Sequence, residues 1–204
     1  MTKVIMMTKM SKPEINIFSE NIHKSLKIDE KKAIETAREL LNIYLNEKTI
    51  FEKSCLFKQD FNCVSFDILY CDNEKTHQIN KEYRQKDYPA DIITFAIFAD
   101  SEEKFVFDKE INLGEIIISL DKVVKKGIKR CKDAKMRRGV EEEPRIHTST
   151  PLIFSACSPE EELYFIIAHG IMHLLGFDHQ TNEDYNFIVD AQNTALKKVR
   201  DGGK

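Results

Sequence analysis

His169-Gly-Ile-Met-His173-Leu-Leu-Gly176-Phe-Asp178-His179 is the stretch that decides the fold, and it contains three of the six histidines in the sequence. Residues four apart lie on one face of an α-helix, about one turn from each other. His169 and His173 can therefore direct two imidazoles at one point. Gly176 can take a positive φ, which would end the helix and turn the chain. That turn would bring His179 back as a third ligand.

The residues before this stretch predict a buried helix. Ser158 stands where an N-cap is expected, with Pro159 at the first helical position and Glu161 at the third, as in a capping box. From 163 to 175 the residues are apolar on nearly every side of the helix. Two imidazoles on one face of a buried helix need a shared partner, and a metal ion fits this pattern. The alternative is two hydrogen-bonded core histidines and a third at the surface.

Three neutral imidazoles suit one zinc ion per chain and leave its fourth position open for water, as in catalytic rather than structural zinc sites. The spacing also matches the metzincin protease pattern H-E-x-x-H-x-x-G-x-x-H, except that Gly170 stands in place of the glutamate. That glutamate is the general base of zinc peptidases. The sequence therefore argues against peptidase chemistry by that route.

The histidine stretch resembles the motif H-G-x-L-H-L-x-G-[YF]-D-H of the YbeY family, bacterial rRNA maturation endoribonucleases. Residues 83–95 resemble a second signature of that family, Y-R-x-K-D-x-P-T-D-V-L-S-F, with Ala90 in place of the threonine. Residues 113–119 resemble a third, G-D-I-x-I-S, with Glu115 in place of the aspartate. Together the resemblance covers roughly residues 62–180.

Arg84 and His169 are the predicted catalytic residues. From the sequence alone, Arg84 is an arginine near the end of a polar helix, and such residues usually lie on a solvated face. It could otherwise donate to a phosphate if it lies near the metal. The resemblance implies the second role, because the family's functionally important arginine falls on this position. Asp178 and Glu115 are candidates for taking the proton of the nucleophile, and Glu115 could instead support a ligand histidine or be an edge-strand carboxylate.

A basic run lies between residues 122 and 138, where nine lysines or arginines face one acid, Asp133. The whole chain has a formal net charge of −3. The run is either a solvated helix face or a patch for an RNA backbone, and both interpretations stay open. Residues from about 130 to 157 look like an insertion relative to the family. The other histidines, His23, His77 and His147, are expected at the surface.

The remaining patterns predict a single α+β domain over residues 1–204, a small mixed β-sheet packed with helices, with the zinc site on a helix-turn as in zincins. Residues 1 to about 26 are expected to be an irregular or strand-like lead-in. Helices are predicted at 30–45, capped by Asp29, at 72–83, after Ser119, and from Thr181 onward; strands are predicted at 62–71, 92–98 and 113–119. The five cysteines lack C-x-x-C pairing and indicate reduced thiols. No segment predicts a signal peptide or a membrane span, so a cytoplasmic protein is expected.

The resemblance implies a zinc-dependent, single-strand-specific endoribonuclease acting in maturation of the small-subunit (16S) rRNA and in ribosome quality control. Its expected partners are single-stranded RNA, the small ribosomal subunit and assembly factors, with no DNA and no membrane. Two other classes stay open. One is a metal-stabilised ribosome assembly factor without catalysis, and the other is a zinc hydrolase of another substrate class.

Overall fold

The computed structural model describes residues 12–98, 109–138 and 158–202. The strands are β1 (Glu14–Asn21), β2 (Cys63–Cys71), β3 (Ile92–Ala96) and β4 (Glu110–Ser119). The helices are α1 (Glu30–Asn46), α2 (Lys48–Phe51), α3 (Asn73–Arg84), α4 (Leu120–Arg138), α5 (Pro159–Leu174) and α6 (Asn182–Gly202). The predicted α+β class with a small mixed sheet is therefore confirmed.

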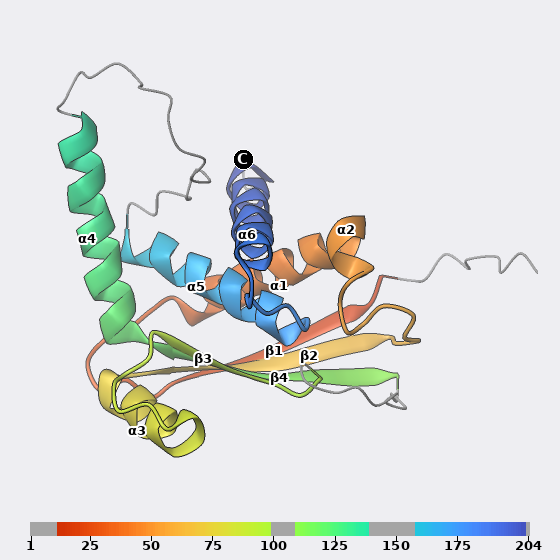
Figure 1. The fold of residues 1–204 in the computed structure, drawn as a ribbon, viewed down its shortest axis with the longest axis horizontal. Helices are drawn as coiled ribbons and strands as arrows, with labels where there is room; N and C mark the ends of the chain where they lie inside the picture. Colours follow the sequence, from red (N-terminus) through yellow and green to blue (C-terminus); the bar gives the residue numbers. More distant parts are fainter. Residues whose placement is uncertain (1–11, 99–108, 139–157, 203–204) are drawn as a thin grey trace, which may run out of the picture.

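The four strands form one sheet in the order β1-β2-β4-β3. β1, β2 and β4 are parallel, and β3 pairs with β4 in the antiparallel direction as an edge strand. Figure 1 shows α1, α5 and α6 on one side of this sheet and α3 on the other. Side chains alternate between the two sides along a strand, so Ile116 packs toward α5 while Ile117 packs with Ile79 of α3.

Each predicted helix start carries a side-chain cap. Asp29 and Asp72 accept from the amides of Lys32 and Lys75, at 3.0 and 2.9 Å. Ser158 Oγ accepts from the Glu161 amide at 3.1 Å, which confirms the predicted cap of α5. α5 then lies in the centre of the helical layer, where Ile167 and Ile171 are fully buried. Each such side chain contributes about 1.5–3 kcal/mol when it leaves water.

β4 contains a bulge that sets which residues face α5. The register between β2 and β4 shifts between Ser65 and Asp67, opposite Gly114. Gly114 has a φ of +124°, and a Cβ on it would lie 1.9 Å from the carbonyl oxygen of Phe95. Only glycine fits this position without moving the backbone of β3.

Of the two expectations for the lead-in, irregular or strand-like, the second is confirmed. It contains a regular strand, β1, which pairs with β2 along its whole length. The predicted surface position of His23 is wrong: it is 7% exposed and its Nε2 lies 3.2 Å from Asp121. Its Nδ1 accepts from the Leu26 amide at 2.9 Å, so His23 organises the turn into α1. His77 is exposed as predicted, whereas His147 lies outside the described residues.

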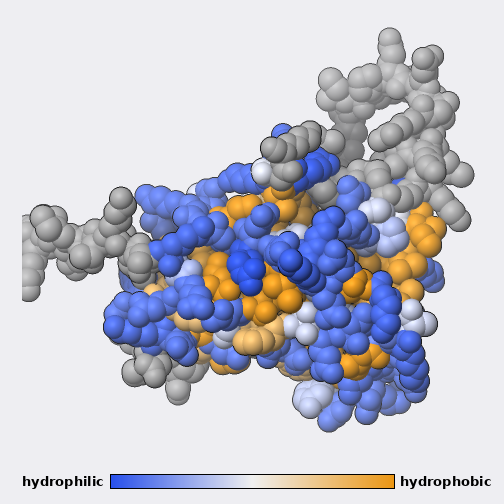
Figure 2. All heavy atoms as spheres, turned by 180° about the vertical axis from the view of Figure 1, so that it is seen from behind, coloured by the Kyte–Doolittle hydropathy of each residue, from blue (hydrophilic) through white to orange (hydrophobic). Residues whose placement is uncertain are grey.

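Viewed from behind, the molecule shows apolar side chains gathered in hollows between ridges of hydrophilic ones (Figure 2). None of the helices in the described ranges is long and apolar enough to span a membrane. The predicted insertion extends largely over residues 139–157, which lie outside the described ranges, and it stays a prediction.

Candidate metal centre

The three histidines of the sequence motif meet in space. His169 and His173 lie one turn apart near the end of α5, and Gly176 follows with a φ of +92°. The chain turns there and brings His179 back. One ligand atom from each imidazole lies within 4.8 Å of the others. The turn chemistry predicted from Gly176 is therefore present, and it assembles a group that could hold a metal ion.

The two helical imidazoles present the same type of atom to each other. His169 Nε2 and His173 Nε2 are 3.0 Å apart. His169 Nδ1 is 3.4 Å from the side-chain oxygen of Gln192, and the His173 ring bonds to the backbone of Phe177. When each Nδ1–H donates in this way, each Nε2 carries a lone pair, and the two lone pairs face one another. This arrangement needs a cation or a proton between them.

The donor set fits zinc. In a tetrahedral site with Zn–N bonds of about 2.0–2.1 Å, two ligand nitrogens lie roughly 3.3 Å apart. The Nε2 atoms of His169 and His173 are already near that spacing at 3.0 Å. His179 is the exposed member of the three, so the open side of the centre faces solvent. A fourth ligand from water or substrate can approach there.

Burial keeps the two helical imidazoles neutral. It lowers the pKa of His169 to about 4, with a smaller effect from the charge of His173. Burial also lowers the pKa of His173, followed by the charge of His179. A metal ligand must be deprotonated to bind, so these shifts leave both nitrogens available at neutral pH.

Gln192 of α6 is a site residue that the sequence did not reveal. It is fully buried, and its amide nitrogen donates to the Phe165 carbonyl at 3.3 Å. This bond directs its oxygen toward His169 Nδ1 and so selects the tautomer with a free Nε2. The residue lies 23 positions beyond the histidine, and no local pattern connects the two.

Gly170 explains why the metzincin glutamate is missing. A Cβ at this position would lie 2.8 Å from Cδ1 and 2.9 Å from Cγ2 of Ile116, and 3.0 Å from Cδ1 of Ile92. The position therefore faces the sheet and not the metal centre. A glutamate here could not reach a nucleophile without separating α5 from the sheet, which agrees with the absence of that base.

Arg84 lies on the last turn of α3 and is exposed. Its positive charge is one of the smaller influences that lower the pKa of His173, behind burial and the charge of His179. The loop after Arg84 is held by side chains of α3. Asp87 lies 2.8 Å from His77 Nε2 and 3.2 Å from Lys81 Nζ, and the buried Asn80 donates to the Tyr88 carbonyl at 2.8 Å. Arg84 is thus an exposed cation within electrostatic range of the centre, at a fixed corner of the fold.

Neither candidate for proton acceptor is well placed. Glu115 shares the α3 side of the sheet with Leu69, Phe95 and Ile117, on the opposite face from the histidines. It cannot support a ligand histidine. Asp178 accepts from the His179 amide at 2.8 Å, and this bond holds its pKa below the usual range. The aspartate stabilises the turn and is a weak base.

The basic run divides into two groups within the part whose side chains are described. Lys126 is ion-paired with Asp91, and Arg130 with Glu162 at 2.7 Å. The Arg130 guanidinium also lies over the Phe165 ring at 4.9 Å. Lys125 and Lys129 are exposed. Lys126 and Arg130 therefore bind α4 to its neighbours, whereas Lys125 and Lys129 face solvent.

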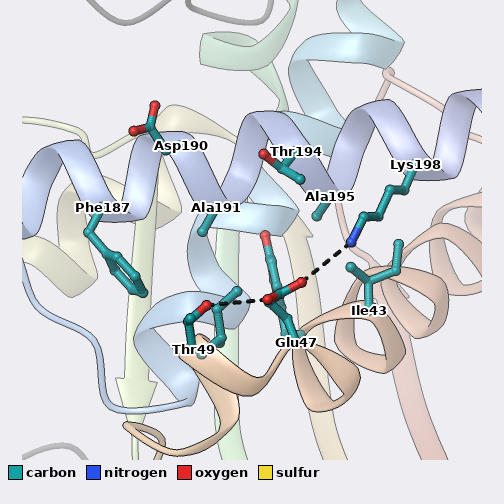
Figure 3. Close-up of a pocket in the computed structure, with 11 residues that line it drawn as sticks. Ile43, Glu47, Thr49, Phe187, Asp190, Ala191, Thr194, Ala195 and Lys198 are labelled. Atoms are coloured by element: carbon teal, nitrogen blue, oxygen red, sulfur yellow. Dashed lines mark hydrogen bonds and ion pairs between the residues drawn. The ribbon is translucent and has the colours of Figure 1, made fainter.

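A hollow of about 300 Å³ lies between α6 and the α1–α2 corner. Figure 3 shows Phe187, Ala191 and Ala195 on the α6 side, with Lys198 reaching Glu47 across the hollow at 3.5 Å. Lys198 pairs with one of the two acids that line the hollow, Glu47, and the histidines do not line it. The chemistry therefore points to the metal centre and not to this hollow.

Comparison with known proteins identifies a family and relatives that this chain resembles. The sequence model of the family described as "Endoribonuclease YbeY" matches residues 18–139 and 153–200. A protein of Acetivibrio thermocellus with that name is 32% identical over 194 residues, 91% of this chain and 97% of the relative. Another from Malacoplasma penetrans is 32% identical over 67% of this chain and 71% of the relative. A solution structure from Thermotoga maritima, TM1509, aligns over 91% of this chain and 88% of that chain at 19% identity and a TM-score of 0.44.

Proposed function

Since the chain belongs to the YbeY endoribonuclease family, we propose that it cleaves single-stranded RNA at a zinc ion held by His169, His173 and His179. The observation that carries the proposal is the 3.0 Å approach of two Nε2 atoms whose rings are tied elsewhere through Gln192 and the Phe177 backbone. A pair of core histidines satisfied by ordinary hydrogen bonds would not present two lone pairs to each other.

Each residue of the centre has its own role in the proposed reaction. Zinc, when bound, supplies a Lewis acid and makes hydroxide available near neutral pH. His169 and His173 hold it with neutral imidazoles, and His179 closes the ligand set from the solvent side. Arg84 stabilises the extra negative charge that develops on the phosphodiester, because a guanidinium can donate to two phosphoryl oxygens at once. His77, Lys81 and Asn80 hold the loop that follows Arg84.

The proposed substrate is small-subunit (16S) rRNA during its maturation and in ribosome quality control, so the small subunit and its assembly factors are the expected partners. Ribosome assembly in bacteria is cytoplasmic, which makes this a cytoplasmic role. The exposed Lys125 and Lys129 of α4 support a contact with an RNA backbone, since such contacts are driven by counterion release. Gly170 argues against peptides as substrates, because it cannot supply a base.

The test is elemental analysis together with cleavage of a single-stranded RNA, with and without chelator. We expect one zinc per chain, cleavage by the loaded protein, loss on chelation and recovery on adding zinc back. The three ligands also join α5 to the loop before α6, which favours one alternative, a metal-stabilised assembly factor without catalysis. That alternative predicts a lower melting temperature after chelation and no cleavage by the loaded protein.

A further inference from the structure

Tyr185 is an exposed aromatic residue next to the metal centre. Half of its side chain is exposed, and its ring lies 6.2 Å from the ring of His179, at an interplanar angle of 79°. His179 is itself the exposed histidine of the three. An edge-to-face contact with one neighbour, in a side chain that is half exposed, leaves ring surface for a further partner.

Tyr185 is held in place by the start of α6. Thr181 Oγ1 accepts from the Asp184 amide at 3.1 Å, and Asp184 Oδ2 accepts from the Thr181 amide at 3.2 Å and from its hydroxyl at 2.6 Å. The Tyr185 amide donates to the Thr181 carbonyl at 3.0 Å. The backbone that carries the ring is therefore fixed, and little backbone entropy is lost when a ligand stacks on it.

We propose that Tyr185 is a stacking platform for the base of a nucleotide next to the scissile phosphate, and that it determines a preference for single-stranded RNA. The inference rests on the proposed function, because it takes the metal centre as the place where the phosphodiester binds. Tyr185 adjoins that place, because its ring lies 6.2 Å from the ring of His179. Each base stacked on an aromatic side chain adds affinity without regard to its identity.

The preference for single strands follows from the same contact. In a duplex both faces of each base are covered by neighbouring base pairs, so Tyr185 has no free face to meet. In a single strand a base can be splayed out onto the ring. Phe18 provides a matched control, since it is 65% exposed but projects from the sheet face that also carries Asp67 and Glu115.

The experiment uses the zinc-loaded protein and short single-stranded and duplex RNAs, with binding followed by stopped-flow anisotropy before cleavage proceeds. Tyr185→Leu should weaken single-strand binding by about 5- to 100-fold and leave duplex binding unchanged, while Tyr185→Phe keeps both. Phe18→Leu should match the wild type. A single abasic nucleotide, placed in turn at each position near the cleavage site, should weaken wild-type binding at one position and have no effect there on Tyr185→Leu.

The outcomes separate this inference from the proposed function. Equal single-strand affinity of Tyr185→Leu and wild type, or abasic losses that are the same in both proteins, would overturn the stacking role while cleavage stands. Loss of zinc by Tyr185→Leu together with abasic-insensitive wild-type binding would make the residue structural and also overturn it. Absence of RNA binding and cleavage by the loaded wild type would overturn the proposed function, and the inference with it.

Discussion

The buried polar side chains at the two ends of α5 have opposite kinds of partner. Near its start Glu162 is 1% exposed and faces Arg130 of α4 at 2.7 Å, so the chain supplies the opposite charge itself. Near its end the Nε2 atoms of His169 and His173 face each other, and His179 adds a third imidazole nitrogen instead of an opposite charge. Glu162 and His169 are seven residues apart, close to two helical turns, and so they lie along one side of the helix.

The difference shows which buried polar group has a partner within the protein. The Glu162 carboxylate has an opposite charge beside it, although neither Glu162 Oε2 nor Arg130 Nη1 makes a hydrogen bond within the described residues, and this ion pair joins α4 to α5. Neutral imidazoles that converge on a point are incomplete until a cation arrives. Burial has opposite consequences as well: it raises the pKa of Glu162 and lowers the pKa of His169, because in each case it disfavours the charged form.

The largest expected effect comes from removing a ligand at the histidine end. His173→Ala should lower zinc affinity by more than about hundredfold, since the loss of supporting partners alone costs 10–100-fold. RNA cleavage should fall with the zinc. Elemental analysis after dialysis measures the content. His77→Ala is the control for zinc content alone, because that exposed histidine bonds to Asp87 in the loop after Arg84. Full zinc content in His173→Ala would remove this residue from the metal centre.

The next effect separates catalysis from metal binding. Arg84→Ala should keep zinc and fold but lose cleavage by roughly a hundredfold or more, the scale seen when one charge-stabilising donor is removed. Arg84→Lys should recover only part, because an ammonium cannot make the bidentate contact. A cleavage time course on single-stranded RNA, run beside zinc content and thermal melting, makes the measurement. Cleavage at the wild-type rate by Arg84→Ala would exclude a role in the transition state.

The histidine end could be predicted from sequence because its determinants are local. One helix and the turn after it contain all of them: Ser158, the histidines at i and i+4, and Gly176. The structure confirms the cap, the shared face and the positive φ. The role of Arg84 was reached through resemblance and stays a proposal. Geometry adds only that its charge acts on His173.

The other features depend on contacts distant in sequence, and the sequence did not reveal them. Gln192 meets His169 and Arg130 meets Glu162 only after α6 and α4 have packed on α5. The sequence predicts only an irregular or strand-like lead-in over residues 1 to about 26. β1 has only a short apolar alternation, Ile15 and Ile17, and it becomes a strand because β2 offers it a full parallel partner. His23 was expected at the surface, but it is buried, and its Nε2–H donates to Asp121.

At the ion pair at the start of α5, changing Arg130 should lower the unfolding free energy more than changing Glu162. Arg130→Met leaves a buried carboxylate without its partner and should cost about 3–5 kcal/mol of unfolding free energy. Arg130 is 31% exposed, so Glu162→Leu costs less because the guanidinium can turn to water. The double variant should be close to the wild type. Urea unfolding measures all three, and equal losses in Arg130→Met and the double variant would contradict this account of the pair.

Gln192 tests whether the tautomer of His169 matters for metal binding. Gln192→Leu removes the acceptor for Nδ1–H while keeping a similar volume, and should lower zinc affinity by about 10–100-fold. Gln192→Glu restores an acceptor and should retain most of the affinity. Competition with a chromophoric chelator gives the affinities. Thermal melting of the chelated proteins provides the control. If Gln192→Leu melted at a lower temperature than the wild type without zinc but bound zinc equally well, Gln192 would have a role in packing alone.

The smallest effect is expected from the exposed part of α4. Reversing Lys125 and Lys129 to glutamate should weaken RNA binding a few-fold and reduce the slope of log affinity against log salt by about 1.4, since each contact with a single strand contributes about 0.7. These residues are exposed, so stability should not change. Lys31→Glu with Lys197→Glu, at exposed positions on α1 and α6, is the matched control, with the same change in charge. An unchanged salt slope in the α4 variant would show that this face is only solvated. An equal decrease in both double variants would show an effect of net charge and not of position, because a path for the RNA backbone requires α4 to matter more than the control positions.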